Sequence, residues 1–336
     1  MLNKISKSTL SNEDALAYIL KDSQRFITQT EIIPIVKAYN RILAVDIVSD
    51  TNIPGADTSS RDGFCFGASS LNNIGSDSFN LTLQKEQIHA GHVIDFIREG
   101  ECAYIATGGV LPSGADTVVP FEDVEVNIDE TKVTVKTNIQ IGEFVRPKAS
   151  EMKIGEVVAK KYTRIEPEIA GQILSAGTFM VEVFKKPIVA ILTSGAEIVM
   201  PWEKPKPWQV RTSNPTVMAM LVEKFGGICL DFGIAKDTGE NIFELFTKAV
   251  NAADVIVTSG GIAMGKHDPT RNMFSKLGLE SVFQKYGSHY RPVFYSVYKN
   301  KPVFALPGTP IGMYRIFEKF VGPFLESIGG RREFRV

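Results

Sequence analysis

The chain has 336 residues and a formal net charge of −1, from 37 basic and 38 acidic side chains. Because neither sign is gathered into long runs, the composition argues against a nucleic-acid-binding protein. The first residues lack the apolar core of a signal peptide and no later stretch is apolar enough to span a bilayer, so we expect a cytoplasmic protein without membrane association. The length favours several domains over one.

The cysteines exclude two further classes of protein. Cys65, Cys102 and Cys229 lie far apart and form no C-x-x-C pair. This spacing argues against a disulfide framework and against a structural zinc site. We expect all three to be buried free thiols.

The first half of the chain predicts a β-rich insert within a helical domain. Ser11 followed by Asp14 is a variant of the capping box, so a helix is expected to begin there. From about residue 48 to 142 the pattern changes to short β segments at residues 79–83, 117–119 and 132–135. Between residues 146 and 180 it turns helical again. We therefore predict a discontinuous domain of residues 1–47 and 143–180, with a β-rich insert at 48–142.

Residues 181–330 predict an α/β domain in which a parallel sheet is covered by helices on both faces, a three-layer arrangement. Apolar strands are expected at residues 187–192, 255–257 and 303–306, and a helix at 238–252. Asn214-Pro215 and Thr309-Pro310 each place a capping side chain before a proline, which marks a helix start. The helix that follows Asn214 is expected to end at Gly226-Gly227.

Ligands of open α/β sheets bind beyond the carboxyl ends of the strands, so the residues that follow each predicted strand are the candidate site. The loop at residues 259–261, Ser-Gly-Gly, suits a phosphate cradle and suits an ordinary tight turn equally well. Neither a Walker A nor a G-x-G-x-x-G motif is present. Glu197, Asp237 and Asp268 would hold Mg²⁺ if they converge, and would otherwise be solvated loop residues. Arg146 and Lys148 could bind a phosphate, and the alternative is that they are a solvated pair of cations.

The order of these segments resembles that of a known enzyme family. Residues 54–64, Pro-Gly-Ala-Asp-Thr-Ser-Ser-Arg-Asp-Gly-Phe, are similar to the family stretch Pro-x-x-Asp-x-Ser-Ala-Met-Asp-Gly-Tyr, and residues 107–116 to Thr-Gly-Ala-x-x-Pro-x-Gly-Ala-Asp. Residues 193–197 resemble Ser-Thr-Gly-Asp-Glu, residues 259–261 keep Ser-Gly-Gly, and residues 306–310 resemble Leu-Pro-Gly-Asn-Pro. Together these motifs resemble the molybdopterin molybdenumtransferases, the family of bacterial MoeA and the gephyrin E domain.

The resemblance implies a homodimer that binds adenylylated molybdopterin and molybdate, cleaves the phosphoanhydride with Mg²⁺ or another divalent cation, releases AMP and leaves molybdenum on the dithiolene. It also implies a molybdopterin adenylyltransferase and molybdoenzymes as partners. Carried over residue by residue, it assigns catalytic roles to Asp62, Glu197, Asp237 and Asp268, with the last three as metal ligands. It assigns substrate binding to Thr107, Ser194, Gly195, Ser259, Gly260, Gly261, Arg291, Pro307 and Gly308, and Glu151 matches a further family acid.

Three departures from the family pattern leave other functions open. The chain has Gly-Lys-His-Asp at residues 265–268 where the family has Gly-Glu-Tyr-Asp, so Lys266 replaces an acid. It has Ser288 and Arg291 within a segment that is Lys-Pro-Gly-Lys-Pro in the family. The sequence stops at Val336, so we expect the usual C-terminal β domain to be absent. The alternatives are a catalytically altered relative that binds the pterin or a partner without turnover, and a nucleotide-pyrophosphate hydrolase of the same α/β fold.

Overall fold

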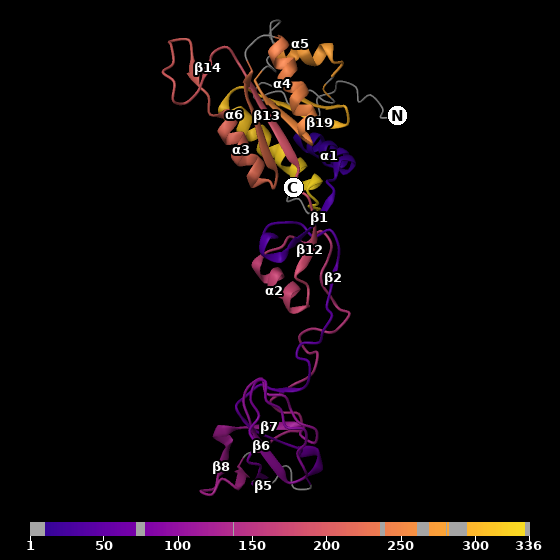
Figure 1. Cartoon of the computed structure of the whole chain (residues 1–336), viewed down its shortest axis with the longest axis vertical. Coiled ribbons are helices and arrows are strands. Elements are labelled where there is room, and N and C mark those ends of the chain that lie inside the picture. Colours follow the sequence, from indigo (N-terminus) through magenta and orange to yellow (C-terminus); the bar gives the residue numbers. More distant parts are fainter. Residues whose placement is uncertain are drawn as a thin grey trace. The chain divides into compact units, whose positions relative to one another are not determined.

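The computed structural model describes residues 11–71, 78–136, 138–235, 239–260, 269–279, 281 and 294–332. The chain divides into two compact units (Figure 1). The first, called the α/β unit, comprises Met1–Val45, Lys160–Ala170 and Met180–Val336, and the second, called the β unit, comprises Asp46–Ala159 and Gly171–Phe179. The finer division into three domains stays a prediction.

The α/β unit is built on a five-stranded sheet with the order β16-β13-β17-β19-β18. These strands are β16 (Ile228–Ala235), β13 (Ile188–Ser194), β17 (Val255–Ser259), β19 (Lys301–Leu306) and β18 (Phe294–Tyr298). The first four run parallel, and β18 is an antiparallel edge strand. The three strands predicted in this region are confirmed as β13, β17 and β19.

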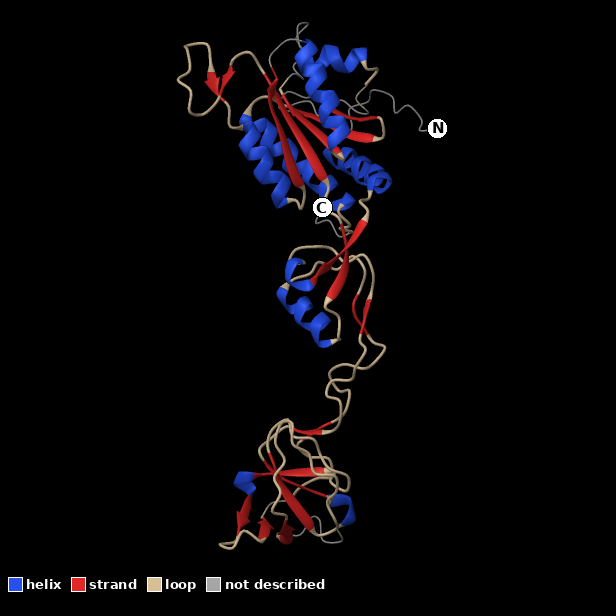
Figure 2. Ribbon diagram, viewed as in Figure 1, coloured by secondary structure: helices blue, strands red, loops and turns tan. Residues whose placement is uncertain are grey.

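Helices cover both faces of this sheet, as Figure 2 shows. Alternate residues of β13 enter different cores: Val189 and Ile191 belong to one cluster, and Ala190 and Leu192 to the other. The first cluster is completed by α1 (Asn12–Ser23), α3 (Asn214–Lys224), α6 (Pro310–Ile316), the π-helical turn Phe317–Val321 and α7 (Gly322–Ile328). The second is completed by α4 (Gly239–Ala252) and α5 (Pro269–Lys276). The predicted three-layer α/β arrangement is therefore confirmed.

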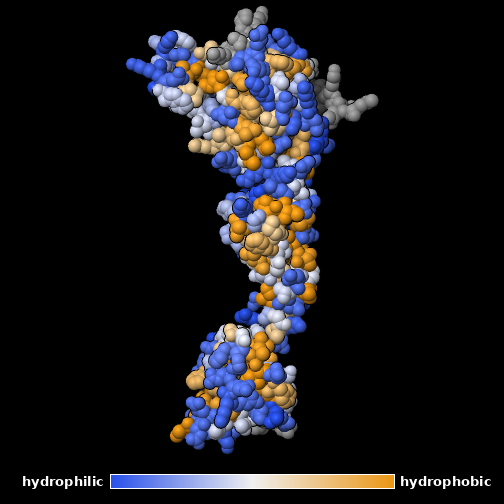
Figure 3. Space-filling view, in the orientation of Figure 1, coloured by the Kyte–Doolittle hydropathy of each residue, from blue (hydrophilic) through white to orange (hydrophobic). Residues whose placement is uncertain are grey.

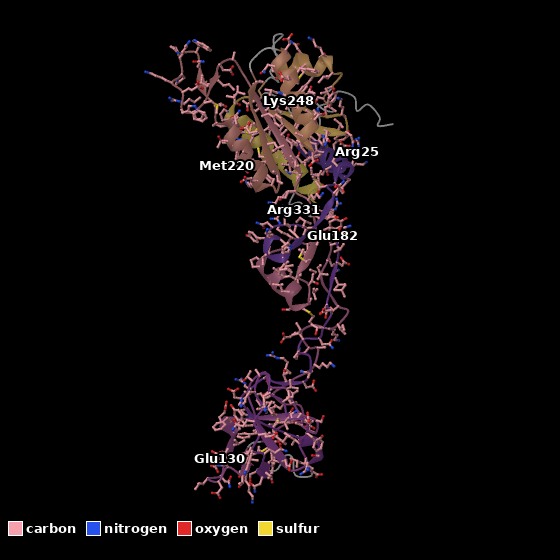
Figure 4. The ribbon with its side chains drawn as sticks, viewed as in Figure 1. Arg25, Glu130, Glu182, Met220, Lys248 and Arg331 are labelled. Carbon is pink, nitrogen blue, oxygen red and sulfur yellow. The ribbon has the colours of Figure 1, made fainter. Side chains whose placement is uncertain are left out.

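Most helix boundaries follow the local signals in the sequence. Ser11 caps α1 by accepting a hydrogen bond from the amide of Asp14 at 3.0 Å. Helix α3 ends as predicted, because Gly226 has a φ of 80° and the amides of Gly226 and Gly227 bond back to Glu223 and Val222. Met220 is exposed on the outer face of α3 (Figure 4). Thr309 stands at the N-cap position of α6, but its side chain makes no capping hydrogen bond.

The β unit is organised by a six-stranded sheet with the order β7-β4-β6-β5-β9-β8. Its strands are β7 (Thr117–Pro120), β4 (Gly63–Phe66), β6 (Glu101–Ile105), β5 (Phe79–Leu83), β9 (Lys132–Val135) and β8 (Val124–Val126). The three β segments predicted here are confirmed as β5, β7 and β9. Cys65 and Cys102 are buried free thiols, as expected, and burial raises the pKa of each to about 12. Cys229, in the α/β unit, is only partly buried.

The helical prediction for residues 146–180 is mostly wrong. Only α2 (Pro167–Ser175) is a helix in this stretch. The remainder contains β10 (Val145–Arg146), which pairs with β3 (Thr58–Ser59), and β11 (Val157–Ala159), which pairs with β2 (Ile47–Val48). These strands exist because of partners about 90 to 110 residues away in the chain, and local periodicity carries no signal for such pairing. No helix in the described ranges is long and apolar enough to cross a bilayer.

Candidate active site

The carboxyl ends of the parallel strands meet at one edge of the α/β sheet. Ser259, the last residue of β17, lies beside Thr193 of β13 and beside Leu306, the last residue of β19. Ser194 lies beside Ala235, the last residue of β16. The loops that follow β13, β17 and β19 therefore start side by side. This edge brings together the candidate residues Ser194, Gly195, Ser259, Gly260, Pro307 and Gly308.

Asn214 links two of these loops through its side chain. Its Nδ2 donates hydrogen bonds to the Ser259 hydroxyl and to the Gly308 carbonyl, each at 2.8 Å, and Ser259 in turn donates to the Pro307 carbonyl at 3.3 Å. Asn214 is 3% exposed, and its Oδ1 has no hydrogen-bond partner among the described residues. The sequence misled us here: Ser213 takes the N-cap position of α3, and Asn214 is the first helical residue. The prediction that Asn214 caps this helix is wrong because its side chain is used across the site.

Gly260 allows the loops to pack backbone against backbone. Its φ is 91°, and a Cβ at this position would lie 2.4 Å from the Ser194 carbonyl oxygen. A Cβ on Gly308 would lie 3.5 Å from the Cα of Gly260. The amide of Gly260 already donates to the Leu306 carbonyl at 3.1 Å, so this amide is not free for a phosphate. Close approach between loops therefore explains this glycine.

Glu197 is an exposed carboxylate at the same edge. Its two carboxylate oxygens lie 2.9 and 3.0 Å from the position that a Cβ of Gly195 would occupy, so the side chain folds back over that glycine. The Glu197 carbonyl accepts a hydrogen bond from the amide of Val210 at 2.8 Å. Beside it, the hydroxyls of Ser194 and Thr270 lie 3.2 Å apart. Carboxylate oxygens such as those of Glu197 are the donor type that hard divalent cations prefer.

The β unit carries a second candidate group, formed by Asp62 and Thr107. Asp62 precedes β4 and Thr107 follows β6, and the pairing of Gly63 with Ile105 brings the two together. Asp62 Oδ1 accepts hydrogen bonds from the Thr107 amide at 2.7 Å and from its hydroxyl at 2.9 Å. These bonds, the backbone one foremost, lower the pKa of Asp62 below its ordinary value. Both residues are exposed, so the ionised carboxylate faces solvent.

Arg146, Lys148 and Glu151 also lie in the β unit. Arg146 Nη1 is 3.1 Å from Glu151 Oε1, and both side chains are about half exposed. The Lys148 amide donates to Asp57 Oδ1 at 2.7 Å. An exposed ion pair of this kind contributes little to stability, about 0–1 kcal/mol. Arg146 and Glu151 are therefore held together only weakly.

Comparison with known proteins decides the family. Residues 10–177 match the family described as MoeA N-terminal region (domain I and II), and residues 190–327 match the probable molybdopterin binding domain. The molybdopterin molybdenumtransferase of Nostoc sp. (strain PCC 7120) is 30% identical, over 92% of this chain and 71% of its own length. The molybdopterin molybdenumtransferase of Staphylococcus aureus (strain Mu50) is also 30% identical, over 92% of this chain and 75% of its own. The chain belongs to the molybdopterin molybdenumtransferase family.

A solved structure supports the same family assignment. The molybdopterin biosynthesis MoeA protein of Pyrococcus horikosii superposes with a TM-score of 0.81 at 32% identity, covering 96% of this chain and 81% of that one. The MoeA-like fold expected from the sequence motifs is thus confirmed, and the family places the chain in molybdenum cofactor biosynthesis.

Several candidate residues lie outside the described part of the chain. These are Asp237, Gly261, Asp268 and Arg291, together with the departures Lys266 and Ser288. Of the three predicted metal ligands only Glu197 is described, and the described residues contain no cluster of three or more metal-binding side chains. The unpaired Asn214 Oδ1 and the Glu197 carboxylate fit a hard cation in donor type. The assignments of function to individual residues of this family member stay predictions.

The contact between Asp62 and Thr107 gives a first testable prediction. Thr107→Val removes the hydroxyl but keeps the backbone hydrogen bond, which is the larger cause of the lowered pKa. We expect the pKa of Asp62 to rise only part of the way to its ordinary value, as measured by an NMR titration of its carboxyl carbon. In the wild type, the stabilisation from these bonds is present above the unfolded pKa and is lost as the pH falls through the folded pKa. An unchanged pKa in the variant would show that the hydroxyl bond is not made.

Proposed function

We propose that this chain transfers molybdenum from molybdate to adenylylated molybdopterin and releases AMP. The observation that carries the proposal is that the loops after β13, β17 and β19 start side by side, with the last two tied together by Asn214 and with Glu197 exposed in the first. This arrangement presents the Ser194 hydroxyl and closely packed backbone at the edge where open α/β sheets bind ligands. The relatives that share the fold are named for the same reaction.

Different residues are proposed to bind the substrate and the metal ion. Ser194 would offer its hydroxyl to the substrate, and Arg291 would neutralise a phosphate with its guanidinium. The Ser259 hydroxyl is buried and bonded to Asn214 and Pro307, so Ser259 would act by positioning its loop. Glu197, Asp237 and Asp268 would hold Mg²⁺ or another divalent cation through carboxylate oxygens. When bound, such a cation withdraws charge from the phosphoanhydride and assists its cleavage. In the proposed reaction, water cleaves the phosphoanhydride into AMP and the pterin monophosphate. The two dithiolene thiols bind molybdenum, and their protons leave with one molybdate oxygen as water.

The proposal extends to assembly and partners. We infer a homodimer, which the resemblance to the family supports. A molybdopterin adenylyltransferase would supply the substrate and molybdoenzymes would receive the product. Analytical ultracentrifugation of the purified protein tests whether it is a dimer.

One assay separates the three candidate functions. Purified protein is incubated with adenylylated molybdopterin, molybdate and Mg²⁺, and AMP release is followed together with pterin-bound molybdenum. We expect both products to form in equal amounts. Release of AMP without molybdenum insertion would indicate a pyrophosphate hydrolase. Tight pterin binding with neither product would indicate a catalytically altered relative.

Substitution of the proposed metal ligands tests their role within that assay. Glu197→Gln and Asp268→Asn keep the side-chain shape and remove the charge, so each is expected to slow AMP release by about 100-fold or more, since even outer-shell residues of metal sites cost 10–100-fold. The matched control is Glu244→Gln, an exposed glutamate on α4 that pairs with Lys248. Unchanged turnover in either site variant would remove that residue from the metal site.

A further inference from the structure

Two exposed tryptophans stand on a loop that leaves the candidate active site. Residues 200–209, here called the tryptophan loop, connect β14 (Ile198–Val199) to β15 (Val210–Arg211). Trp202 is 78% exposed and Trp208 is 60% exposed, and they are the only tryptophans in the chain. Indole side chains are usually well buried, because each carries a large apolar area. Two exposed indoles on one loop point to a ligand.

Both ends of the tryptophan loop are fixed to the site. It starts three residues after Glu197, and Asn214 follows five residues after it ends. The two short strands at its base pair in parallel, Ile198 with Val210 and Val199 with Arg211. The amide of Val210 donates to the Glu197 carbonyl at 2.8 Å. In Figure 1 the loop at β14 stands out from the edge of the α/β unit where β13 ends.

The loop has a defined structure of its own. Glu203 accepts a hydrogen bond from the Met200 amide at 2.7 Å through its carboxylate, and its carbonyl accepts one from Arg211 Nε at 3.0 Å. The side chain of Gln209 accepts one from the Lys206 amide at 3.2 Å. Three prolines, Pro201, Pro205 and Pro207, restrict the backbone further. Holding aromatic side chains in place before binding lowers the entropy lost when a ligand arrives.

The charges of the loop favour an anionic aromatic ligand. Residues 200–211 carry three basic side chains, Lys204, Lys206 and Arg211, and one acidic side chain, Glu203. Lys206 Nζ lies 5.9 Å from the centre of the Trp208 ring. Figure 3 shows a largely hydrophilic surface at the outer end of this loop. Indole rings stack on flat heterocycles, and adjacent cations attract the phosphates attached to them.

We propose that Trp202 and Trp208 form a stacking subsite for a heteroaromatic ring of the phosphorylated substrate. This inference rests on the proposed function, in which the substrate carries a pterin and an adenine joined through a pyrophosphate. The two rings share the same stacking chemistry. In this proposal the tryptophan loop holds one ring, and the loops around Ser259 hold the reacting part of the substrate.

Intrinsic fluorescence tests the subsite because the chain has no other tryptophan. AMP and free pterin are titrated separately into the purified full chain, with free tryptophan titrated in parallel to correct for absorption by the ligand. We expect saturable quenching by the ligand whose ring occupies the subsite. The same binding is measured by calorimetry for the wild type, Trp202→Ala, Trp208→Ala and the corresponding Phe variants. One Ala variant at least is expected to bind about tenfold more weakly, and its Phe variant to recover most of the affinity.

The control is Phe243→Ala, which removes an exposed aromatic ring from α4 in the same unit. It should leave both the quenching and the affinity unchanged. Calorimetric binding without quenching, and with unaltered affinity in both Ala variants, would overturn the subsite and leave the proposed function intact. Ala variants that dissociate into monomers at unchanged affinity would also overturn it, because the indoles would then contact a second copy of the chain. Absence of both AMP binding and AMP release in the wild type would instead overturn the proposed function.

Discussion

Gly260→Ala is expected to abolish AMP release and to lower the thermal stability of the α/β unit. The residue has a φ of 91°, and its added Cβ would lie 2.4 Å from the Ser194 carbonyl oxygen. A positive φ alone costs an L-residue about 1–2 kcal/mol. The contact adds to that cost, because the atom it meets is backbone and cannot rotate away. The loops after β13 and β17 must therefore separate, which displaces both serine hydroxyls.

The chain offers a matched control for this substitution. Gly278 also has a positive φ, 67°, but apart from its chain neighbours no atom of the described residues lies within 4 Å of the position that its Cβ would take. Gly278→Ala should therefore cost only the backbone strain, about 1–2 kcal/mol, and keep full activity. Thermal unfolding and AMP release are measured on both variants. Equal losses in the two would mean that the close contact with Ser194 has no part in the site.

The position of the candidate site could be inferred from the sequence, but the hydrogen bonds that join its loops could not. Apolar runs identified β13, β17 and β19, and the rule that ligands bind at the carboxyl ends of parallel strands then selected loops that the structure places side by side. The link from Asn214 to Ser259 and Gly308 spans 45 and 94 residues. Only the folded sheet brings such distant groups together. The sequence around Asn214, with proline following, carries the local signature of a helix cap, and this signature concealed the longer contact.

In the β unit, too, the sequence indicated the polar residues but not the contact between them. The motifs around Asp62 and Thr107 each marked a polar residue of interest. Their hydrogen bonds, however, depend on the register that places Gly63 opposite Ile105 in the sheet. Strand register is set by the whole sheet and its turns. The family resemblance supplied the identity of these residues, and the structure supplied the hydrogen bonds that join them.

Substitutions of Asn214 are expected to have the second large effect on stability and AMP release. Two variants distinguish the loss of its hydrogen bonds from the loss of its side-chain shape. Asn214→Ala removes both donated bonds and leaves the Gly308 carbonyl without this donor, at a cost of about 1–3 kcal/mol. Asn214→Asp keeps the shape, but an ionised carboxylate has no proton to donate to that carbonyl and repels it. The buried charge adds a desolvation penalty that the alanine variant avoids. At neutral pH the aspartate variant should therefore be the less stable of the two and should release AMP more slowly.

The pH dependence of the two Asn214 variants distinguishes charge from shape. Burial and the facing carbonyl would raise the pKa of the introduced aspartate in the folded state above its unfolded value of about 3.9. Its protonated form can donate to the Gly308 carbonyl, so the folded state favours the proton and stability is lost as the pH rises above the unfolded pKa. Denaturant unfolding from about pH 4 to about pH 8 should show Asn214→Asp losing stability steadily. Asn214→Ala should show only the pH dependence of the wild type. Greater stability of the aspartate variant at about pH 8 would mean that a cation lies beside residue 214, and would move this residue from the linkage of the loops to the metal site.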